Sequence, residues 1–298
     1  MKSSKNNPNN KPYALFIGRW QPFHNGHKYI IDKMIAKDKE VCIAIRDTKI
    51  SDANPFTVSQ REEMIRRIYG EKVKIITIPD IESVNIGRNV GYEINLIKVP
   101  KKISNISATA IRNGSAFSLP DEVSNYLSLF KKTIWFTGLP CSGKTTIAKE
   151  LKTELNKRGF NAVHLDADEL RKTINSDLGY SDEDRMENIR RIVHIAKLFN
   201  QNNIPVVASF ITPTNEMREM VKNTLDNPFL VYTKCSLEEC KKRDSKGMYM
   251  KAIKGELGYF TGVSAPFENP KEVFTVDTEK HQAYECCLKI MKKLDYFD

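Results

Sequence analysis

Residues 133–145 read TIWFTGLPCSGKT, in which a short β-prone run leads directly into the pattern Gly-x-x-x-x-Gly-Lys-Thr. Residues 144–158 then carry apolar positions at helical spacing, and Gly159 ends that pattern. Glycines let backbone N–H groups turn inward around a phosphate, and a helix that starts behind them adds positive potential. The stretch therefore predicts a strand, a phosphate-binding loop and a helix, which is the start of an α/β domain.

This loop predicts a binding site for the phosphates of ATP together with Mg²⁺. Lys144 would neutralise charge on the outer phosphates during catalysis, and the hydroxyl of Thr145 would be a ligand of Mg²⁺. A glycine-rich turn that only packs a helix on a sheet is the alternative, and the position of the pattern between a strand and a helix disfavours it. The expected ATP-binding residues are Gly138, Cys141, Ser142, Gly143, Lys144, Thr145 and Thr146.

Strands and helices alternate along the whole chain, as parallel sheets covered by helices require. The rhythm restarts after Lys131-Lys132, so we expect two three-layer α/β domains, each with a parallel sheet. Their expected ranges are a disordered tail at 1–12, a first domain at 13–130 and a P-loop domain at 131–298. Expected strands are 13–18, 41–45, 73–79, 133–138, 161–166, 204–210 and 229–235; expected helices are 28–36, 58–69, 107–113, 120–129, 144–158, 183–200, 215–225 and 280–293.

Composition excludes several classes of protein. The chain has 298 residues, of which 40% are hydrophobic and 28% charged, unlike collagen-like or fully disordered chains. No apolar run approaches the ~20 residues of a membrane span. The first ten residues lack the apolar block of a secretory signal, and the six cysteines show no C-x-x-C spacing. We therefore expect a cytoplasmic protein with free thiols and without a membrane partner.

The net charge of +10 raises the question of nucleic acid. Its cations are scattered along the chain rather than clustered with aromatic residues, which favours small phosphate-bearing molecules as partners. The sequence leaves open whether the chain is a monomer or a homodimer.

Two carboxylates follow the expected strand at 161–166. Asp166 and Asp168 are two residues apart, so at the end of a strand both side chains would project the same way, toward the phosphate-binding loop. Such a pair can hold metal-bound water or accept the proton of an attacking hydroxyl. Solvated loop residues or a helix cap are the alternative for two acids in this place.

Two histidines follow the first expected strand. In GRWQPFHNGHKYII, His24 and His27 are three apart with Gly26 between them, a spacing that lets both imidazoles share one face of a helix. Two imidazole N–H donors beside a helix N-terminus can stabilise a triphosphate as pyrophosphate leaves. Two unrelated surface histidines are the alternative. Zinc is disfavoured, since the other histidines, 164, 194 and 281, all lie in the second half of the chain.

The motifs of the second half resemble the adenylylsulfate (APS) kinase family. They are FTGLPCSGKTTIAKEL, LDADELR, LGYSDEDRMENIRRI, ASFITP and RDSKGMYMKAIKGELGYFTGVSAPFENP, in the order of the family and over nearly all of 133–278. The resemblance implies phosphorylation of the ribose 3′-hydroxyl of adenylyl sulfate by Mg²⁺-ATP. It also implies that residues 246–262 form a lid over both nucleotides. The implied substrate-binding residues are Arg171, Tyr180, Arg185, Asn188, Lys246 and Phe260, with the arginines and Asn188 on the sulfate–phosphate anhydride and sugar, and with Tyr180 and Phe260 on either side of the adenine.

This sequence departs from the usual pattern of that family near the acceptor nucleotide. Leu-Asp-Gly-Asp-Asn becomes LDADE, with Ala167 and Glu169, and Thr212 stands where some members have a serine that can be phosphorylated. Thr214 and Asn215 replace a tyrosine and an arginine. The alternative that the kinase acts on another nucleotide anhydride therefore stays open.

The first half resembles the nucleotidylyltransferase superfamily with its H-x-G-H signature. NPFTVSQREEMI at 54–65 and ISATAIRNG at 106–114 are most similar to archaeal-type nicotinamide-mononucleotide adenylyltransferases. The resemblance implies a Rossmann-like domain in which His24 and His27 act in nucleotidyl transfer. The implied contacts of the nucleoside triphosphate further include Gly18, Arg19, Ser107, Thr109 and Arg112. Helix capping is the alternative for Ser107 and Thr109.

Together these features predict a bifunctional enzyme that uses ATP and Mg²⁺, with a nucleotidylyltransferase domain of unknown acceptor followed by an APS kinase-like domain. One hypothesis is that the first domain makes the nucleotide anhydride that the second phosphorylates. The alternative is that the first domain binds a nucleotide without catalysing a reaction, because only about 25 residues separate Ile81 from Ile106, where the similar family has a longer strand–helix stretch.

Overall fold

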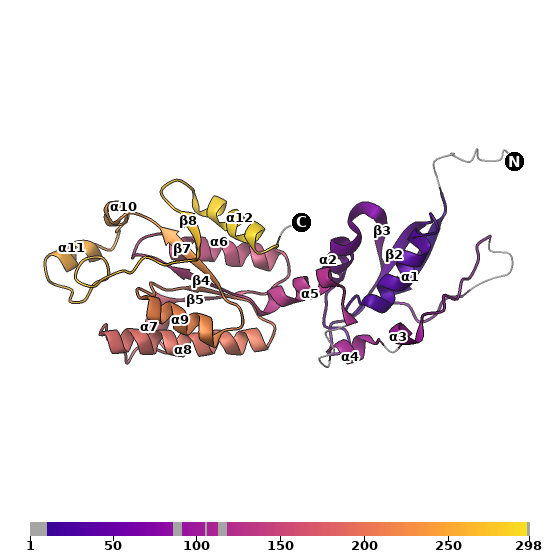
Figure 1. The fold of residues 1–298 in the computed structure, drawn as a ribbon, viewed down its shortest axis with the longest axis horizontal. Coiled ribbons are helices and arrows are strands. Elements are labelled where there is room, and N and C mark those ends of the chain that lie inside the picture. Colours follow the sequence, from indigo (N-terminus) through magenta and orange to yellow (C-terminus); the bar gives the residue numbers. More distant parts are fainter. Residues whose placement is uncertain (1–10, 86–90, 105, 113–117, 297–298) are drawn as a thin grey trace. The chain divides into compact units, whose positions relative to one another are not determined.

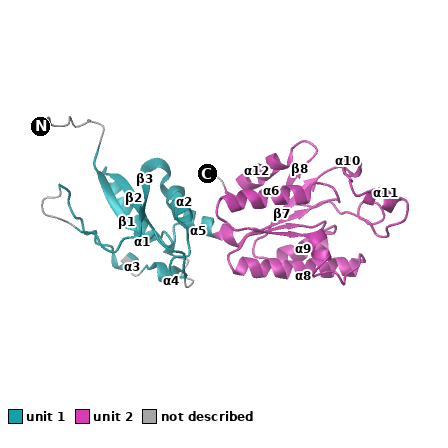
Figure 2. Cartoon of the chain, turned by 180° about the vertical axis from the view of Figure 1, so that it is seen from behind, with its two compact units in different colours: residues 1–127 teal, residues 128–298 magenta. Residues whose placement is uncertain are grey.

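The computed structural model describes residues 11–85, 91–104, 106–112 and 118–296, and it forms two compact units, residues 1–127 and residues 128–298 (Figures 1 and 2). Most of the expected tail, and the expected end of the helix at 113, lie outside the described residues.

The division of the chain falls three residues before the expected one, because η3 (Leu129–Lys131) packs within the second unit. The hydroxyl of Tyr296 donates a hydrogen bond to the carbonyl oxygen of Leu129, at 3.2 Å. The ring of Phe130 lies 4.6 Å from that of Phe160, measured between centroids.

The first unit is built on a parallel sheet in the order β1-β2-β3, formed by β1 (Tyr13–Gly18), β2 (Glu40–Asp47) and β3 (Val73–Pro79). Five consecutive residues of β2, 41–45, are buried, so both faces of this central strand are covered. The helices of this unit are α1 (Asn25–Ile35) and α2 (Val58–Tyr69), which contact β2, and the shorter η1 (Gly70–Lys72), α3 (Lys101–Ser104), α4 (Ala108–Arg112) and α5 (Asp121–Ser128).

The second unit contains a five-stranded parallel sheet in the order β5-β6-β4-β7-β8. All five residues of the central strand β4 are buried. Helices α6 and α12 lie against each other on one face of the sheet, and α8 and α9 on the other, which gives three layers (Figure 1). The strands are β4 (Thr133–Thr137), β5 (Val163–Asp166), β6 (Val206–Ser209), β7 (Phe229–Lys234) and β8 (Phe274–Asp277).

The helices of the second unit are α6 (Lys144–Lys157), α7 (Ala167–Arg171), α8 (Asp182–Gln201), α9 (Asn215–Thr224), α10 (Leu237–Lys242), α11 (Met248–Ile253) and α12 (Ala283–Lys293). The predicted α/β class with parallel sheets is confirmed. The four short elements α7, α10, α11 and β8 were not among the expected ones.

The strand order places the candidate site. From β4 the chain continues to β5 and β6 on one side, and it then crosses to β7 and β8 on the other side, so the direction of strand addition reverses at β4. In an open parallel sheet, a crevice forms outside the carboxyl ends of the strands at such a point. The glycine-rich loop at 138–143 follows the carboxyl end of β4 and therefore lies at this crevice.

Among the described residues, no helix combines the length and the apolar character that crossing a bilayer requires. The six cysteines are all free thiols, and five of them are buried.

The amide of Asn200 joins three segments of the second unit, and we expect its loss to destabilise this unit. Its Oδ1 accepts from Thr133 Oγ1 at 2.6 Å, and its Nδ2 donates to the carbonyl oxygen of Ile204 at 3.1 Å. Asn200→Ala removes the acceptor of the buried Thr133 hydroxyl and the donor to the half-buried Ile204 carbonyl, which costs about 1–3 kcal/mol. Urea unfolding followed by tryptophan fluorescence measures the loss. Asn202→Ala, on an exposed neighbour, is the matched control, and equal stability of the two variants would contradict the prediction.

Candidate functional site

The loop between β4 and α6 requires glycine at two positions. A Cβ on Gly138 would lie 2.3 Å from the Oγ1 of Thr233, far inside any real contact. Gly143 has a φ of +94° and precedes α6 without a side-chain cap for the first turn. The first amides of α6 therefore lack the usual side-chain acceptor and are available to an anion.

Lys144 is folded back over the same loop. It is 8% exposed, and its Nζ donates to the carbonyl oxygens of Gly138 and Leu139, at 2.9 and 2.6 Å. Burial lowers the pKa of this ammonium group to about 8. These contacts hold the charge over the loop, where a phosphate group would replace the carbonyl oxygens as a partner.

Asp166 lies beside the loop, at the end of β5. Its Oδ2 accepts hydrogen bonds from Thr145 Oγ1 and Ser209 Oγ, both at 2.8 Å, and its Oδ1 accepts from the backbone N–H of Asp168 at 3.0 Å. Burial by itself raises the pKa of the Asp166 carboxyl, but these hydrogen bonds outweigh it and the net pKa is lowered. Asp166 is therefore a carboxylate at neutral pH.

The expectation that Asp166 and Asp168 both end a strand and project the same way is wrong. β5 ends at Asp166, which caps α7, and Asp168 lies in the first turn of that helix. The Asp168 side chain is exposed and pairs with Lys246 Nζ at 2.7 Å. Only Asp166 is in direct contact with the phosphate-binding loop, through Thr145.

A cavity of ≈ 730 Å³ opens on the start of α6. Arg243 lies at its wall, where its guanidinium donates to the hydroxyl and the carbonyl oxygen of Thr278, at 3.2 and 2.9 Å. Of the expected ATP-binding residues, five line this cavity: Cys141, Gly143, Lys144, Thr145 and Thr146. Gly138 and Ser142 lie beneath it in the loop, where Ser142 Oγ is 2.7 Å from Thr233 Oγ1.

A second cavity, of ≈ 160 Å³, lies near the amino end of α8 and the segment 257–261. Pro140 of the loop and Ala167 of α7 contribute to its wall. Five of the six expected substrate-binding residues line it: Arg171, Tyr180, Arg185, Asn188 and Phe260. The sixth, Lys246, is not in its wall and instead pairs with Asp168.

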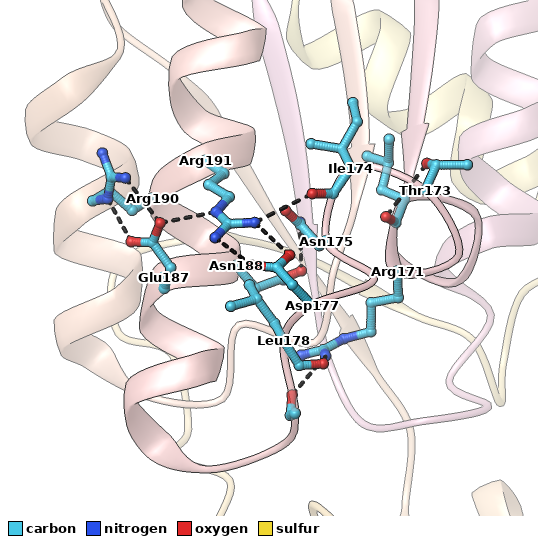
Figure 3. A network of polar contacts seen from close by, with 12 residues as sticks. Arg171, Thr173, Ile174, Asn175, Asp177, Leu178, Glu187, Asn188, Arg190 and Arg191 are labelled. Carbon is cyan, nitrogen blue, oxygen red and sulfur yellow. Dashed lines mark hydrogen bonds and ion pairs between the residues drawn. The ribbon is translucent and has the colours of Figure 1, made fainter.

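Ion pairs and hydrogen bonds fix the loop between α7 and α8, which carries Tyr180 (Figure 3). Arg191 of α8 binds both carboxylate oxygens of Asp177, at 2.7 and 2.8 Å. The amide of Asn175 donates to the Oδ1 of Asn188, at 2.8 Å. This bond fixes the orientation of the Asn188 amide, whose NH₂ group can donate to a ligand.

The two expected arginines are held at the wall of this second cavity. Arg171 donates to the carbonyl oxygen of Gly179 at 2.7 Å, and its guanidinium lies 4.5 Å from the ring centroid of Tyr180. Arg185 donates to Thr261 Oγ1 at 2.6 Å and to the carbonyl oxygen of Tyr259. Arg185 therefore ties α8 to the segment that the sequence predicts as a lid.

Thr212 lies in the wall of this second cavity but is almost fully enclosed. It is 1% exposed, and its hydroxyl accepts a hydrogen bond from Trp135 Nε1 at 2.9 Å. Its backbone has a φ of +44°, a conformation held by Arg218, whose Nη1 donates to the Thr212 carbonyl oxygen at 2.7 Å. In this state the hydroxyl is a structural group rather than an exposed nucleophile.

In the first unit, His24 and His27 lie together as expected. Their rings stack with 3.6 Å between centroids at the start of α1. The Nδ1 of His24 accepts from the backbone N–H of Gly26, and the Nδ1 of His27 from that of His24, at 3.1 and 3.3 Å. Burial lowers the pKa of His24 to about 4, and burial together with the neighbouring His24 lowers that of His27 to about 3. Each ring is therefore neutral at pH 7 and carries its hydrogen on Nε2.

Of the other expected residues of the first unit, Arg112 contacts the turn after β1. Arg112 donates to the carbonyl oxygen of Gln21 at 2.7 Å and to Thr109 Oγ1 at 3.2 Å. Ser107 Oγ accepts from the backbone N–H of Ala110, at 3.1 Å, which is a cap at the start of α4. Gly18 ends β1, where a Cβ would meet the ring of Trp20 at 2.8 Å, and Arg19 is exposed.

Sequence reasoning missed three residues of these sites. Arg243 is the first residue of the segment RDSKGMYM that carries the kinase resemblance, so its position was a usable signal. Ser209 and His164 form a hydrogen bond beside Asp166, at 2.9 Å, and single Ser and His residues in strands give no signal. Within the described part of the chain, no three His, Cys, Asp or Glu side chains gather as a metal-binding group.

We expect both imidazoles of the first unit to stay neutral, with hydrogen on Nε2, from pH 8 down to about pH 5, because each Nδ1 accepts a backbone N–H. Long-range ¹H–¹⁵N correlation spectra measure this, with His24→Gln and His27→Gln to assign the signals. A charged ring at pH 6, or hydrogen on Nδ1, would contradict the geometry.

The same pKa shifts predict how stability depends on pH. The folded values of about 4 and about 3 lie below the unfolded value of 6.5, so the unfolded chain binds more protons between them. The contribution of His24 and His27 to the free energy of unfolding is fully present above pH 6.5 and is lost as the pH falls toward 3.

Comparisons with known proteins agree with this geometry. Residues 131–276 match the family model described as adenylylsulphate kinase, and residues 15–108 match the model described as cytidylyltransferase-like. The expected kinase resemblance is confirmed, and the N-terminal resemblance is confirmed at the level of the cytidylyltransferase-like family.

Individual relatives match the second unit. The adenylyl-sulfate kinase of Thermodesulfovibrio yellowstonii is 49% identical over 162 residues, which cover 53% of this chain and 81% of the relative. That of Bacteroides thetaiotaomicron is 48% identical over the same length and the same shares. Among solved structures, the Mycobacterium tuberculosis APS kinase CysC in complex with AMPPNP and APS aligns with a TM-score of 0.53 and 35% identity, over 55% of this chain and 97% of that one. This chain therefore belongs to the adenylyl-sulfate kinase family, and it joins that kinase domain to an N-terminal cytidylyltransferase-like domain.

Proposed function

We propose that the second unit transfers the γ-phosphoryl group of ATP to the ribose 3′-hydroxyl of adenylyl sulfate, giving 3′-phosphoadenylyl sulfate. The observation that carries the proposal is that residues 138–145, the glycine-rich loop and the start of α6, contribute to the walls of both the ≈ 730 Å³ cavity and the ≈ 160 Å³ cavity, whose linings differ. The larger cavity contains the start of α6 with Lys144 and Thr145, and the lining of the smaller one includes two arginines, an asparagine and four aromatic side chains. Two nucleotides bound there would meet at the loop.

The larger cavity fits the phosphates of ATP. The uncapped start of α6 and the ammonium group of Lys144 offer N–H donors and positive charge to a polyphosphate. Lys144 would then exchange its hydrogen bonds to the carbonyl oxygens of Gly138 and Leu139 for bonds to phosphate oxygens. Arg243 and Thr278 lie where the remainder of the nucleotide would extend. The expected ATP-binding set thus gains Arg243 as a proposed member.

The donors beside the loop fit Mg²⁺. Thr145 Oγ1 and the carboxylate of Asp166 are hard oxygen groups 2.8 Å apart, and Mg²⁺ prefers few such protein ligands together with phosphate oxygens and water. We propose Thr145 as the protein ligand, with Asp166 holding metal-bound water. When bound, Mg²⁺ would neutralise charge on the transferred phosphoryl group.

The smaller cavity fits an acceptor nucleotide with an anionic anhydride. Arg171 and Arg185 offer guanidinium groups, whose planar forks match phosphate and sulfate oxygens. Tyr180 and Phe260 offer ring faces for a base, and the NH₂ group of Asn188 can donate to the sugar or anhydride. Closing of residues 246–262 would exclude water from the transfer, with Lys246 exchanging Asp168 for substrate.

Lys144→Ala tests the kinase site. We expect turnover of ATP, Mg²⁺ and adenylyl sulfate to fall on the order of 10³-fold, because a lost cation at the transferred group removes about 3–4 kcal/mol of transition-state stabilisation. Mass spectrometry of the products measures the reaction. Lys149→Ala, on the exposed side of the same helix, is the matched control. Near-normal turnover by Lys144→Ala would rule out this assignment of the site.

For the first unit we propose nucleotidyl transfer from a nucleoside triphosphate to an acceptor that its residues leave unidentified. The stacked rings of His24 and His27 support this, because two neutral imidazoles with hydrogen on Nε2 are paired donors beside the start of α1. Arg112 and Thr109, which hydrogen-bond each other at 3.2 Å, would bind the phosphates from α4. A nucleotide-binding module without chemistry is the second candidate.

Pyrophosphate release distinguishes these two candidates. We expect the wild-type chain to release pyrophosphate from ATP or CTP with one member of an acceptor panel that includes sulfate and nicotinamide mononucleotide. His24→Asn and His27→Asn should each lower the rate on the order of 10²-fold, because one donor to the developing charge is lost. His194→Asn, exposed in α8, is the control. No release with any acceptor would favour the non-catalytic module.

The same panel tests whether the two units act in sequence. If the first unit makes the anhydride that the kinase phosphorylates, then ATP and the acceptor alone yield the final 3′-phosphorylated product. If the kinase turns over only when adenylyl sulfate is added, the two activities are separate.

A further inference from the structure

A hydrogen-bonded chain beside the phosphate-binding loop involves two residues that the proposed function does not use. In the pairing of β5 with β6, Asp166 lies opposite Ser209. His164 and Asp166 are two apart on β5, so their side chains lie on the same face of the sheet. Ser209 Oγ reaches both, at 2.9 Å from His164 Nε2 and 2.8 Å from Asp166 Oδ2.

The number of hydrogens on each group decides which one donates in each of these hydrogen bonds. The hydroxyl of Ser209 has one hydrogen, and it donates that hydrogen to Asp166 Oδ2. His164 Nε2 must then be the donor to Ser209 Oγ, which fixes the ring with its hydrogen on Nε2. Burial lowers the pKa of His164, so the ring is neutral at pH 7, and the direction of the bonds stays the same if it is protonated.

The last member of this series of hydrogen bonds is Thr145. The hydroxyl of Thr145 also donates its one hydrogen to Asp166 Oδ2, at 2.8 Å. The lone pairs of Thr145 Oγ1 are therefore directed away from the carboxylate, and they are the part of this group that can bind a cation. Any rotation of Asp166 would release the Thr145 hydroxyl from this orientation.

We propose that Ser209 and His164 are positioning residues, which hold the Asp166 carboxylate so that Thr145 presents its oxygen lone pairs to Mg²⁺. This rests on the proposed kinase function of the second unit. Ser209 is 2% exposed, and the side chain of His164 is 9% exposed, so neither would contact a substrate. Their effect is exerted through Asp166, as partners behind a ligand fix its orientation at metal sites.

Four variants test the proposal. Ser209→Ala removes the bond to Asp166, and Ser209→Thr keeps a hydroxyl in the same strand. His164→Leu removes the donor to Ser209, and His164→Gln keeps an N–H donor. His194→Leu, on the exposed surface of α8, is the matched control for the loss of an imidazole.

The first readout is binding without turnover. Electron paramagnetic resonance of Mn²⁺ with the full chain and the nonhydrolysable nucleotide AMPPNP gives the affinity for the cation. We expect Ser209→Ala to weaken it on the order of 10-fold, the lower end for lost partners behind a metal ligand. His164→Leu should weaken it less, while Ser209→Thr, His164→Gln and His194→Leu stay near the wild type.

The second readout is the split between kcat and KM. With saturating ATP and adenylyl sulfate, we expect Ser209→Ala to lower kcat on the order of 10-fold and to leave KM for adenylyl sulfate within about twofold. Higher Mg²⁺ concentration should restore part of the loss. A role limited to packing would change the unfolding temperature and leave the dependence on Mg²⁺ unchanged.

Two results would overturn the proposal. One is a Mn²⁺ affinity of both Ser209→Ala and His164→Leu equal to that of the wild type. The other is equal loss in Ser209→Ala and Ser209→Thr, which would mean that the hydroxyl is irrelevant. If Ser209→Ala does not fold, the comparison of His164→Leu with His164→Gln gives the same decision. Absence of wild-type turnover would instead contradict the proposed function, and the binding measurement would still test this network.

Discussion

The backbone conformation of residues 138–143 is the constraint on which the rest of the second unit depends. A side chain at Gly138 would collide with Thr233 of the neighbouring strand β7, and Gly143 begins α6 from a left-handed conformation. These two positions let the chain leave a fully buried central strand and immediately expose the start of a helix. The turn also sets which cavity each neighbouring residue lines. Lys144 and Thr145 line the larger cavity, and Pro140 lines the smaller one.

A second layer of polar contacts fixes the surroundings of this turn. Asp166 receives three hydrogen bonds and is thereby held as an anion against Thr145. At the other cavity, Arg191 fixes the loop that carries Tyr180 by binding Asp177 (Figure 3). Arg185 bonds to Thr261, in the segment 257–261 of the cavity wall. The side chains that would touch substrates are thus ordered by neighbours that would not.

The sequence predicted the long elements because each carries either a helical period, as in α6, or a continuous apolar run, as in β2. It predicted the phosphate-binding loop because that motif specifies one backbone geometry. It did not predict α7, α10, α11 or β8, which have four to six residues and too few apolar positions to show a period. Asp168 was misplaced because the capping bond from its N–H to Asp166 turns the chain into α7 one residue after β5. His164 and Ser209 meet only through the register of two strands, which no local pattern encodes.

The packing of Leu129 and Phe130 bears on where the chain can be cut to separate its two units. Their partners, Tyr296 and Phe160, belong to the kinase unit, although the alternation of strands and helices along the sequence assigns Leu129 and Phe130 to the preceding domain. A kinase fragment cut at the Lys131-Lys132 pair would therefore lose a ring contact and leave the Tyr296 hydroxyl without its acceptor. A fragment that starts at residue 127 or 128 keeps both, and it is the shorter polypeptide on which kinase chemistry can be studied apart from its fused neighbour.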